Sequence, residues 1–309
     1  MRHNRLNRLT SLMATAGLDA IALNPGPSLT YLTGLHFHLM ERPTVLLIAP
    51  PKTPVIILPA LESAKLNSAS IPLEAIPFSD NPAEWQNAFV RAIDVLNLEK
   101  STIGVEPTRL RYLELRFLEN AAPDTQFTSA EAVLTPLRLR KDKDEISAMQ
   151  KAALIAEEAL QKTLPLVKPG ISERELASEL VLNLLRSGSD SDLPFTPIVA
   201  SGPDSANPHA VPSDRVLMQG DLVLFDWGAS FAGYCSDITR TFALGEPELK
   251  LREVFEVVKQ ANLAGRQAGR PGIRAGDIDK AARLVIEQAG YGQYFTHRTG
   301  HGLGMEGHE

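Results

Sequence analysis

The chain has 309 residues, a length typical of two domains of ordinary size. Hydrophobic residues make up 44% of it and charged residues 22%, which is the composition of a globular protein with enough apolar material for two cores. The net charge of −6, with no long basic run, argues against nucleic acid or an anionic membrane surface as a partner.

The single cysteine, Cys235, excludes an intramolecular disulfide and is consistent with a reducing compartment. The N-terminal stretch is basic, but polar residues interrupt its apolar positions, and Leu6, Leu9 and Met13 recur at helical spacing. We therefore predict an amphipathic opening helix rather than a signal peptide, no membrane span, and a cytoplasmic location.

The N-terminal half alternates helix and strand patterns. Residues 81–96, for example, place Trp85, Phe89 and Ile93 on one helical stripe. We predict helices at 5–16, 81–96 and 109–118 and strands at 19–23, 44–48, 54–58, 70–76 and 102–105. Such alternation predicts a layered α/β domain, which we place at residues 1–137.

The segment LRLRKDKDE, residues 137–145, has a high charge density and no apolar period, so we predict a solvated boundary between two domains. The second domain, residues 143–309, opens with a predicted helix at 144–164. Its apolar face is predicted to comprise Ile146, Met149, Ala153, Ala156 and Leu160.

Further along, Ser172 and Glu175 have the spacing of a capping box and begin a helix whose stripe includes Leu176, Leu180 and Leu184. We then predict strands at 196–200, 216–230 and 234–244 and helices at 248–268 and 276–289.

An aspartate lies inside each of the last two predicted strands, at Asp226 and Asp237. If residues 231–232 form a two-residue turn, these aspartates face each other directly, whereas a three-residue turn that includes Gly233 offsets them. Facing carboxylates repel unless cations lie between them, so the arrangement predicts a site for two divalent metal ions. The alternative is two strand-end aspartates that cap turns or pair with Arg240.

Three of the seven histidines fall within residues 297–308, in the sequence HRTGHGLGMEGH. Imidazole is a common metal ligand and carries protons near neutral pH, and the interleaved glycines allow backbone to approach a ligand closely. The alternative is a flexible Gly/His tail, but Leu303 and Met305 indicate a packed segment. A third segment, SGPDSANPH, ends in His209, and taken alone it favours a surface histidine on a turn.

In this order and spacing, the three segments resemble those of the pita-bread metallopeptidases, which include methionine aminopeptidase, prolidase and Xaa-Pro aminopeptidase. The resemblance implies that three residues are metal ligands. They are Asp226 in an FDxG strand, Asp237 in SDITRTF, and His301 in HxxxHxLG.

The same resemblance implies roles for the remaining histidines. His209 and His308 match catalytic residues that bind substrate and carry protons, and His297 matches a substrate-binding residue that lines the pocket for the proline ring. The family also uses two glutamate ligands C-terminal to the histidine segment. Because the sequence ends at Glu309, we predict an incomplete, C-terminally truncated catalytic domain and an inactive chain.

The N-terminal half resembles the creatinase-type N-terminal domain that precedes the pita-bread domain in this family. The matching stretches are residues 5–13, LDAIAL at 18–23 and SLTYLTGL at 28–35. The resemblance therefore covers nearly the whole chain and implies an α/β creatinase-like domain followed by an α/β pita-bread metallopeptidase domain.

The function implied is dinuclear-metal cleavage of Xaa-Pro bonds in dipeptides or short peptides, as an Xaa-Pro aminopeptidase or dipeptidase. The implied metal is Mn²⁺ or Co²⁺, with Zn²⁺ as an alternative, and the expected partners are a proline-containing peptide and a second copy in a homodimer. Two rivals stay open: a creatinase-like or other amidohydrolase on the same fold, and a non-catalytic scaffold. The retained Asp226 and Asp237 argue against the metal-free creatinase mechanism.

Overall fold

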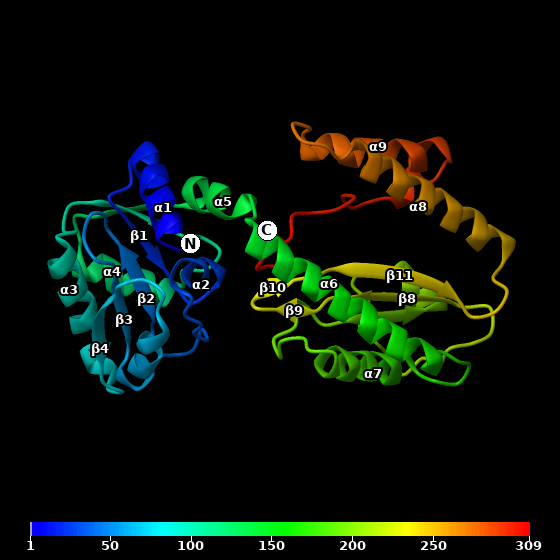
Figure 1. Cartoon of the computed structure of the whole chain (residues 1–309), viewed down its shortest axis with the longest axis horizontal. Helices are drawn as coiled ribbons and strands as arrows, with labels where there is room; N and C mark the ends of the chain where they lie inside the picture. Colours follow the sequence, from blue (N-terminus) through cyan, green and yellow to red (C-terminus); the bar gives the residue numbers. More distant parts are fainter. Residues whose placement is uncertain (1) are drawn as a thin grey trace. The chain divides into compact units, whose positions relative to one another are not determined.

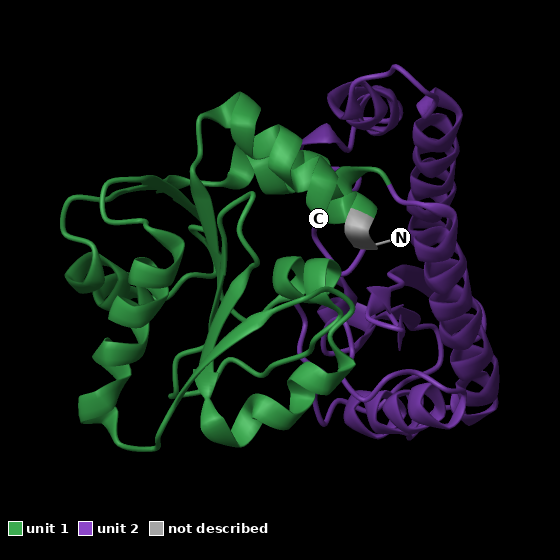
Figure 2. Ribbon diagram, turned by 60° about the vertical axis from the view of Figure 1, so that its left-hand side comes forward, with its two compact units in different colours: residues 1–140 green, residues 141–309 purple. Residues whose placement is uncertain are grey.

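The computed structural model describes residues 2–309, with side chains from residue 4 onward, and divides into two compact units. One comprises residues 1–140 and the other residues 141–309, shown in separate colours in Figure 2. Within the described chain no helix is both long and apolar enough to cross a lipid bilayer.

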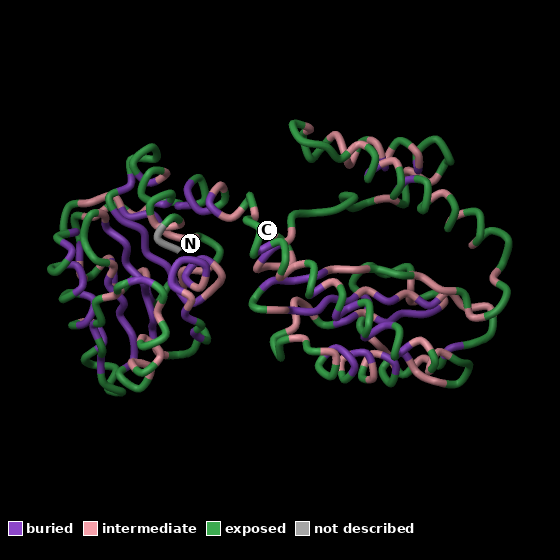
Figure 3. The backbone as a smooth tube through the Cα atoms, viewed as in Figure 1, coloured by how far each residue is buried: buried purple, intermediate pink, exposed green. Residues whose placement is uncertain are grey.

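A six-stranded sheet forms the centre of the first unit. Its strands are β1 (Ala20–Leu23), β2 (Val45–Ile48), β3 (Val55–Pro59), β4 (Glu74–Phe78), β5 (Thr102–Val105) and β6 (Gln126–Ser129). They lie in the order β4-β3-β2-β1-β5-β6 (Figure 1), with β2 antiparallel to both neighbours and the other pairs parallel. Strands β1, β2 and β3 are buried along their whole length, which accounts for their continuous apolar sequences (Figure 3).

The helices of this unit pack their apolar stripes on the sheet. They are α1 (Arg2–Ala16), α2 (Pro27–Thr33), α3 (Trp85–Leu96), α4 (Tyr112–Ala121) and α5 (Glu131–Leu139), with 3-10 turns at Ala60–Ser68 and Pro82–Glu84. Phe89 and Ile93 of α3 are fully buried in the main core, as the stripe predicts. The helix predicted at 109–118 starts later, because the amides of Arg109 and Leu110 both donate to the carbonyl of Glu106 and close a turn first.

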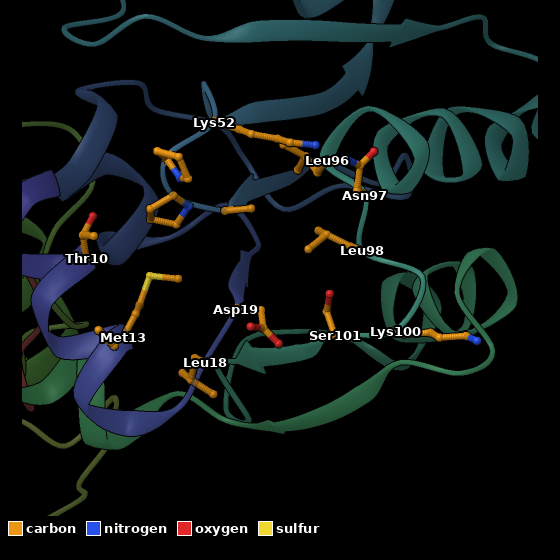
Figure 4. Close-up of a pocket in the computed structure, with 14 residues that line it drawn as sticks. Thr10, Met13, Leu18, Asp19, Lys52, Leu96, Asn97, Leu98, Lys100 and Ser101 are labelled. Carbon is orange, nitrogen blue, oxygen red and sulfur yellow. The ribbon is translucent and has the colours of Figure 1, made fainter.

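A cavity of about 400 Å³ opens in this unit where β1 and β5 begin (Figure 4). Its lining includes Met13, Leu18, Asp19, Lys52, Leu98 and Ser101. The Asp19 carboxylate accepts from the amide of Thr102 at 2.7 Å, and Nζ of Lys52 donates to the carbonyl of Val95 at 2.9 Å. These polar groups hold the unit together, and none of the candidate site residues lines the cavity.

The charged junction between the units is shorter than predicted. Helix α5 runs through the fully buried Leu137, and α6 (Lys143–Thr163) begins directly after its N-cap, Asp142. The Asp142 carboxylate accepts from the amide of Glu145 at 2.9 Å, and the amide of Asp142 donates back to the Glu145 carboxylate at 2.8 Å. The prediction of a solvated linker over 137–145 is therefore wrong at both ends, because its charges form a capping box.

The second unit contains a three-stranded antiparallel sheet in the order β11-β8-β7, with β11 (Ile238–Ala243), β8 (Leu222–Trp227) and β7 (Ile198–Ser201). A separate short hairpin, β9 (Ser230–Phe231) and β10 (Tyr234–Cys235), follows β8. The strand predicted at 216–230 is therefore interrupted twice. A turn closed by a hydrogen bond from the Asp221 amide to the Met218 carbonyl precedes β8, and β8 ends before Gly228.

Helix α6 and helix α7 (Glu173–Arg186) form the core of this unit with the sheet. The capping box of Ser172 and Glu175 is present as predicted, and Leu176, Leu180 and Leu184 are fully buried. The predicted face of α6 is wrong in part. Ile146 is 46% exposed, and the buried apolar positions are Ala152, Ile155, Ala156, Ala159 and Leu160.

Helices α8 (Leu249–Ala268) and α9 (Ala275–Gln288) pack on each other through a small core of their own, which contains Ala261, Ala282 and Ile286. Most of α8 is exposed along its length (Figure 3). A 3-10 turn at Gly292–Tyr294 follows, and the last 15 residues, 295–309, have no regular secondary structure. This irregular stretch carries three of the candidate site histidines.

Candidate metal centre

Strand β8 alternates between a buried and a half-buried face. Val223, Phe225 and Trp227 are buried in the helix-covered core, whereas Asp226 lies on the opposite face. Its Oδ1 accepts a hydrogen bond of 2.8 Å from Oγ1 of Thr239, the residue directly opposite on β11. The alternation predicted from the sequence therefore places the Asp226 carboxylate away from the main core.

The register between the two aspartate-bearing strands differs from the directly facing arrangement. The two-residue turn consists of Ala232 and Gly233, with φ of 51° and 78°, so both central residues have the positive φ of a type I′ turn. Asp226 pairs with Thr239, and Asp237 lies just before β11, diagonal to Asp226. The facing prediction is wrong because the turn lies one residue later than residues 231–232.

A glycine allows the two strands to cross closely beside the aspartates. A Cβ atom on Gly228 would overlap the carbonyl oxygen of Ser236. The amide of Ser236 donates to the Ala229 carbonyl at 2.9 Å, and the Ala229 amide donates to Oγ of Ser236 at the same distance. Only a residue without a side chain fits at position 228, which explains the Gly that follows Asp226 by two positions.

Helix α6 anchors the backbone next to both carboxylates. Nε1 of Trp227, beside Asp226, donates to the carbonyl of Ala156 at 2.9 Å. Oγ of Ser236, beside Asp237, donates to the carbonyl of Ala152 at 3.1 Å. Both donors are buried, so these bonds fix where each aspartate leaves its strand.

His301 reaches the carboxylates from the C-terminal segment. Its Nε2 lies 3.3 Å from Oδ2 of Asp237, and both side chains keep about a quarter of their exposure. Nδ1 lies 3.0 Å from the carbonyl oxygen of Gly302. A carbonyl can only accept, so Nδ1 carries a proton and Nε2 is the nitrogen left to act as a ligand.

The surroundings of Asp226 are unfavourable for a lone carboxylate. Burial raises its pKa, and the neighbouring charge of Asp237 acts in the same direction, whereas the hydrogen bond from Thr239 and the nearby His301 oppose the shift. A positive ion beside these groups would stabilise both ionised carboxylates.

His308 packs on His301, with ring centroids 3.8 Å apart and planes inclined by 13°. Nη2 of Arg298 lies 3.1 Å from Nδ1 of His308. Because a guanidinium can only donate, Nδ1 of His308 is an acceptor, and the ring proton of the neutral form is on Nε2. The two stacked histidines therefore carry their protons on different nitrogens.

His297 lies apart from this stack. The centroid of its ring lies 4.9 Å from that of Phe295, with the two planes inclined by 70°, and its Nδ1 lies 2.8 Å from the carbonyl oxygen of Arg298. His297 is exposed. No direct contact joins His297 to His301 among the interactions that the described residues make.

His209 lies on the exposed loop between β7 and β8, and its amide donates to Oδ1 of Asn207 at 3.0 Å. Glu173, which was not predicted from the sequence, holds the residues on either side of the stretch 202–212 that carries His209. The Glu173 carboxylate accepts from the amide and hydroxyl of Ser201 at 2.7 and 2.8 Å, and from the amide and hydroxyl of Ser213 at 3.1 and 2.8 Å. Its position in the first turn of α7 suggested only helix capping.

Carboxylate oxygens and imidazole nitrogen are the donors that manganese, cobalt and zinc accept, so the donor types fit a divalent ion. The pairwise contacts bring Asp237 to His301 and Asp226 into electrostatic reach of both. Among the residues that the structure describes, however, no three such side chains are close enough together to enclose an ion. The arrangement is an open, partial donor set.

Cys235 lies two residues before Asp237 and is buried, with 5% of its surface exposed. Its amide donates to the carbonyl of Gly304 at 2.8 Å, which joins the hairpin to the histidine segment. Burial raises the pKa of its thiol to about 11. The cysteine is therefore a packed core residue whose thiol is protonated at neutral pH.

Comparison with known proteins decides the family. Residues 147–309 match the sequence pattern of metallopeptidase family M24, and residues 5–140 match that of the creatinase/prolidase N-terminal domain. The chain belongs to metallopeptidase family M24. The predicted fold class, a creatinase-like α/β domain followed by a pita-bread α/β domain, is thereby confirmed.

Solved structures of M24 peptidases resemble the chain over nearly its whole length. A dipeptidase from Pyrococcus horikoshii OT3 is 38% identical, with a TM-score of 0.91, and the match covers 99% of this chain and 83% of that one. A prolidase from Thermococcus sibiricus is 34% identical with a TM-score of 0.93, covering 100% and 83%. An Xaa-Pro dipeptidase from Bacillus anthracis is 34% identical with a TM-score of 0.89, covering 100% and 84%. M24 peptidases use divalent metal ions, so the predicted class of cofactor is confirmed.

Proposed function

We propose that this M24 protein is a proline-specific peptidase that acts on dipeptides or short peptides with proline in the second position. The observation that carries the proposal is the 3.3 Å approach of His301 Nε2 to the Asp237 carboxylate, which joins the two motifs implied to bind metal. The prolidase and Xaa-Pro dipeptidase named above support the substrate class.

In this proposal Asp226, Asp237 and His301 hold divalent ions, Mn²⁺ or Co²⁺ in the first place. Bound ions supply Lewis acidity that polarises the scissile carbonyl and activates a water. The contribution of the chain is to orient the donors. Hydrogen bonds from Thr239 to Oδ1 of Asp226 and from His301 Nδ1 to the Gly302 carbonyl leave Oδ2 of Asp226 and Nε2 of His301 as the atoms that would donate to an ion.

The neighbouring histidines supply and accept protons in this proposal. Arg298 leaves His308 with its proton on Nε2, which can donate to an oxygen that becomes negative as the carbonyl is attacked. His209 is exposed on a loop held at both ends and is available to bind substrate. The His297 ring, against Phe295, offers a flat apolar surface to the ring of proline.

The proposal is tested with two variants and two measurements. In a form of the protein that cleaves Ala-Pro, Asp237→Ala is expected to abolish both Mn²⁺ binding, measured by calorimetry, and this cleavage. His209→Ala is expected to keep Mn²⁺ binding and to lower turnover by about 10²–10³, the usual loss for one transition-state hydrogen bond. His38→Ala, in the first unit, is the matched control and should change neither quantity.

Four outcomes would contradict the proposal. Equal cleavage of Ala-Pro and Ala-Leu would refute the specificity for proline. Hydrolysis of small amides or guanidino compounds, but of no peptide, would make the protein an amidohydrolase. If the protein bound no divalent metal ion in stoichiometric amount, it would be a non-catalytic scaffold. Loss of Mn²⁺ binding in His209→Ala would refute the roles assigned to the histidines.

A further inference from the structure

Helix α9 carries an ion pair on the side that meets the histidine segment. Nε of Arg283 lies 3.1 Å from Oδ2 of Asp279, one helical turn away. The helix itself is fixed by Ala282 and Ile286, which pack in the small core shared with α8. The pair is therefore presented from a rigid support, and Arg283 together with backbone and hydroxyl donors from Thr299 lowers the pKa of Asp279.

The Asp279–Arg283 pair contacts three alternate residues of the histidine segment. Arg283 donates to the carbonyls of Phe295 and His297, each at 2.8 Å, and its guanidinium lies over the Phe295 ring at 4.5 Å. Oδ1 of Asp279 accepts from the amide and the hydroxyl of Thr299 at 2.7 and 2.9 Å. Contacts at positions 295, 297 and 299 prevent the segment from sliding along the helix.

Apart from this pair, residues 296–302 are held by the contacts of Arg298 and His301 with His308, by that of His301 with Asp237, and by a hydrogen bond from the Glu309 amide to the Gly302 carbonyl. Residues 296–302 are all exposed, so burial of side chains contributes little to their position. Helix α8 also passes close to Thr299, because a Cβ atom built on Gly265 would lie 3.7 Å from the Thr299 methyl group, an ordinary van der Waals distance. His301 follows Thr299 by two residues, and its direction depends on where Thr299 is fixed.

We infer that Asp279 and Arg283 are positioning residues that fix the segment carrying His297 and His301 at the metal centre. Their hydrogen bonds go to Thr299 and to the carbonyls of Phe295 and His297, and not to the candidate ligand atoms of Asp226, Asp237 or His301. The consequence for metal binding rests on the proposed function of His301 as a ligand, whereas the positioning itself does not.

The test compares Asp279→Ala and Asp279→Asn with Asp277→Asn in the full chain. Asp277 lies on the same helix and pairs only with Lys280, at 3.4 Å, among the contacts found for it. The readouts are amide hydrogen exchange followed residue by residue by NMR, the ring nitrogen signals of His301, and Mn²⁺ affinity by calorimetry.

Loss of a charge-assisted hydrogen bond is expected to speed exchange of the Thr299 amide by about tenfold or more in Asp279→Ala. Asp279→Asn keeps an acceptor oxygen and should show an intermediate increase, and Asp277→Asn none. The His301 signals should shift or broaden and Mn²⁺ affinity should fall in the same order. Amides in the α8–α9 core should exchange as in the wild type.

Unchanged Thr299 exchange in Asp279→Ala would overturn the inference. So would an increase of equal size throughout α8 and α9, because that would show a loss of helix stability and not of positioning. A wild-type chain that binds no Mn²⁺ would refute the proposed function instead, and the inference would still be decided by the exchange at Thr299.

Discussion

Glu173 and Asp279 each hold a segment that carries a candidate site histidine, but their surroundings differ. Glu173 is buried, with 1% of its surface exposed, and accepts four hydrogen bonds from Ser201 and Ser213 at the two ends of the His209 loop. The Asp279 side chain is 26% exposed and shares its bonds between Thr299 and Arg283.

This difference in burial predicts that Glu173 contributes to the stability of the whole second unit, whereas Asp279 contributes to the local order of one segment. Removing a buried acceptor leaves several donors without a partner, which weakens the whole unit. Removing an acceptor near the surface lets water take its place, so the effect stays close to the segment. The four experiments that follow test this contrast, from the largest expected effect to the smallest.

Glu173→Gln should lower the free energy of unfolding of the second unit by about 3 kcal/mol, because an amide cannot accept from both serines. Urea denaturation followed by circular dichroism measures the change. Glu179→Gln, on the same helix without such contacts, is the control and should stay within about 0.5 kcal/mol of the wild type. A loss below about 1 kcal/mol would show that the carboxylate is not a structural anchor.

Ser213→Ala should cost about 1 kcal/mol, because Glu173 keeps the amide bond from residue 213 and loses only the hydroxyl. The same substitution should speed amide exchange in residues 202–212 more than in β8. Equal effects of Ser213→Ala and Glu173→Gln on unfolding would mean that one hydroxyl accounts for the whole anchor.

Asp279→Asn should lower the free energy of unfolding by less than about 1 kcal/mol, as is usual for an ion pair near the surface. The loss should shrink between 0.05 and 1 M NaCl, because salt screens the pair with Arg283. Urea titrations at both salt concentrations measure it. A loss that is large and independent of salt would place Asp279 in the same class as Glu173.

The loss of stability in Asp279→Asn should depend on pH, and the pKa of Asp279 determines the sign of that dependence. The folded-state pKa of Asp279 is lowered by Arg283 and Thr299, so its contribution to stability is present above the unfolded value, about 4, and is lost as pH falls through the lower folded value. The difference between wild type and Asp279→Asn should be constant from pH 8 to about pH 5 and vanish in more acidic solution. A difference that grew on acidification would reverse the assignment.

Local signals in the sequence predicted much of the fold. The capping box at Ser172 and the stripe of Leu176, Leu180 and Leu184 involve residues within one or two helical turns, so spacing alone identifies them. The register of Asp226 against Asp237 could not be predicted in the same way. It depends on which two residues of a short loop adopt positive φ, and Ala232 is an unusual residue to do so.

The aspartates and histidines of the candidate site could be predicted from the sequence. Glu173 and Asp279, which hold the segments that carry the histidines, could not. Glu173 meets Ser201 and Ser213, which lie 28 and 40 residues away, and Asp279 meets Thr299, 20 residues away. A glutamate in the first turn of a helix and an aspartate on a polar helix face are both common without any such partner. Only the folded chain distinguishes them from ordinary surface charges.

The buried thiol of Cys235 makes the protein convenient for site-directed labelling. With a pKa of about 11 and 5% exposure, the thiol is protonated and shielded at neutral pH, and the chain has no other cysteine. A maleimide dye should therefore attach only to a cysteine introduced at an exposed position such as Glu157. Fluorophore pairs on the histidine segment and on α6 can then report distances without replacement of the native residue.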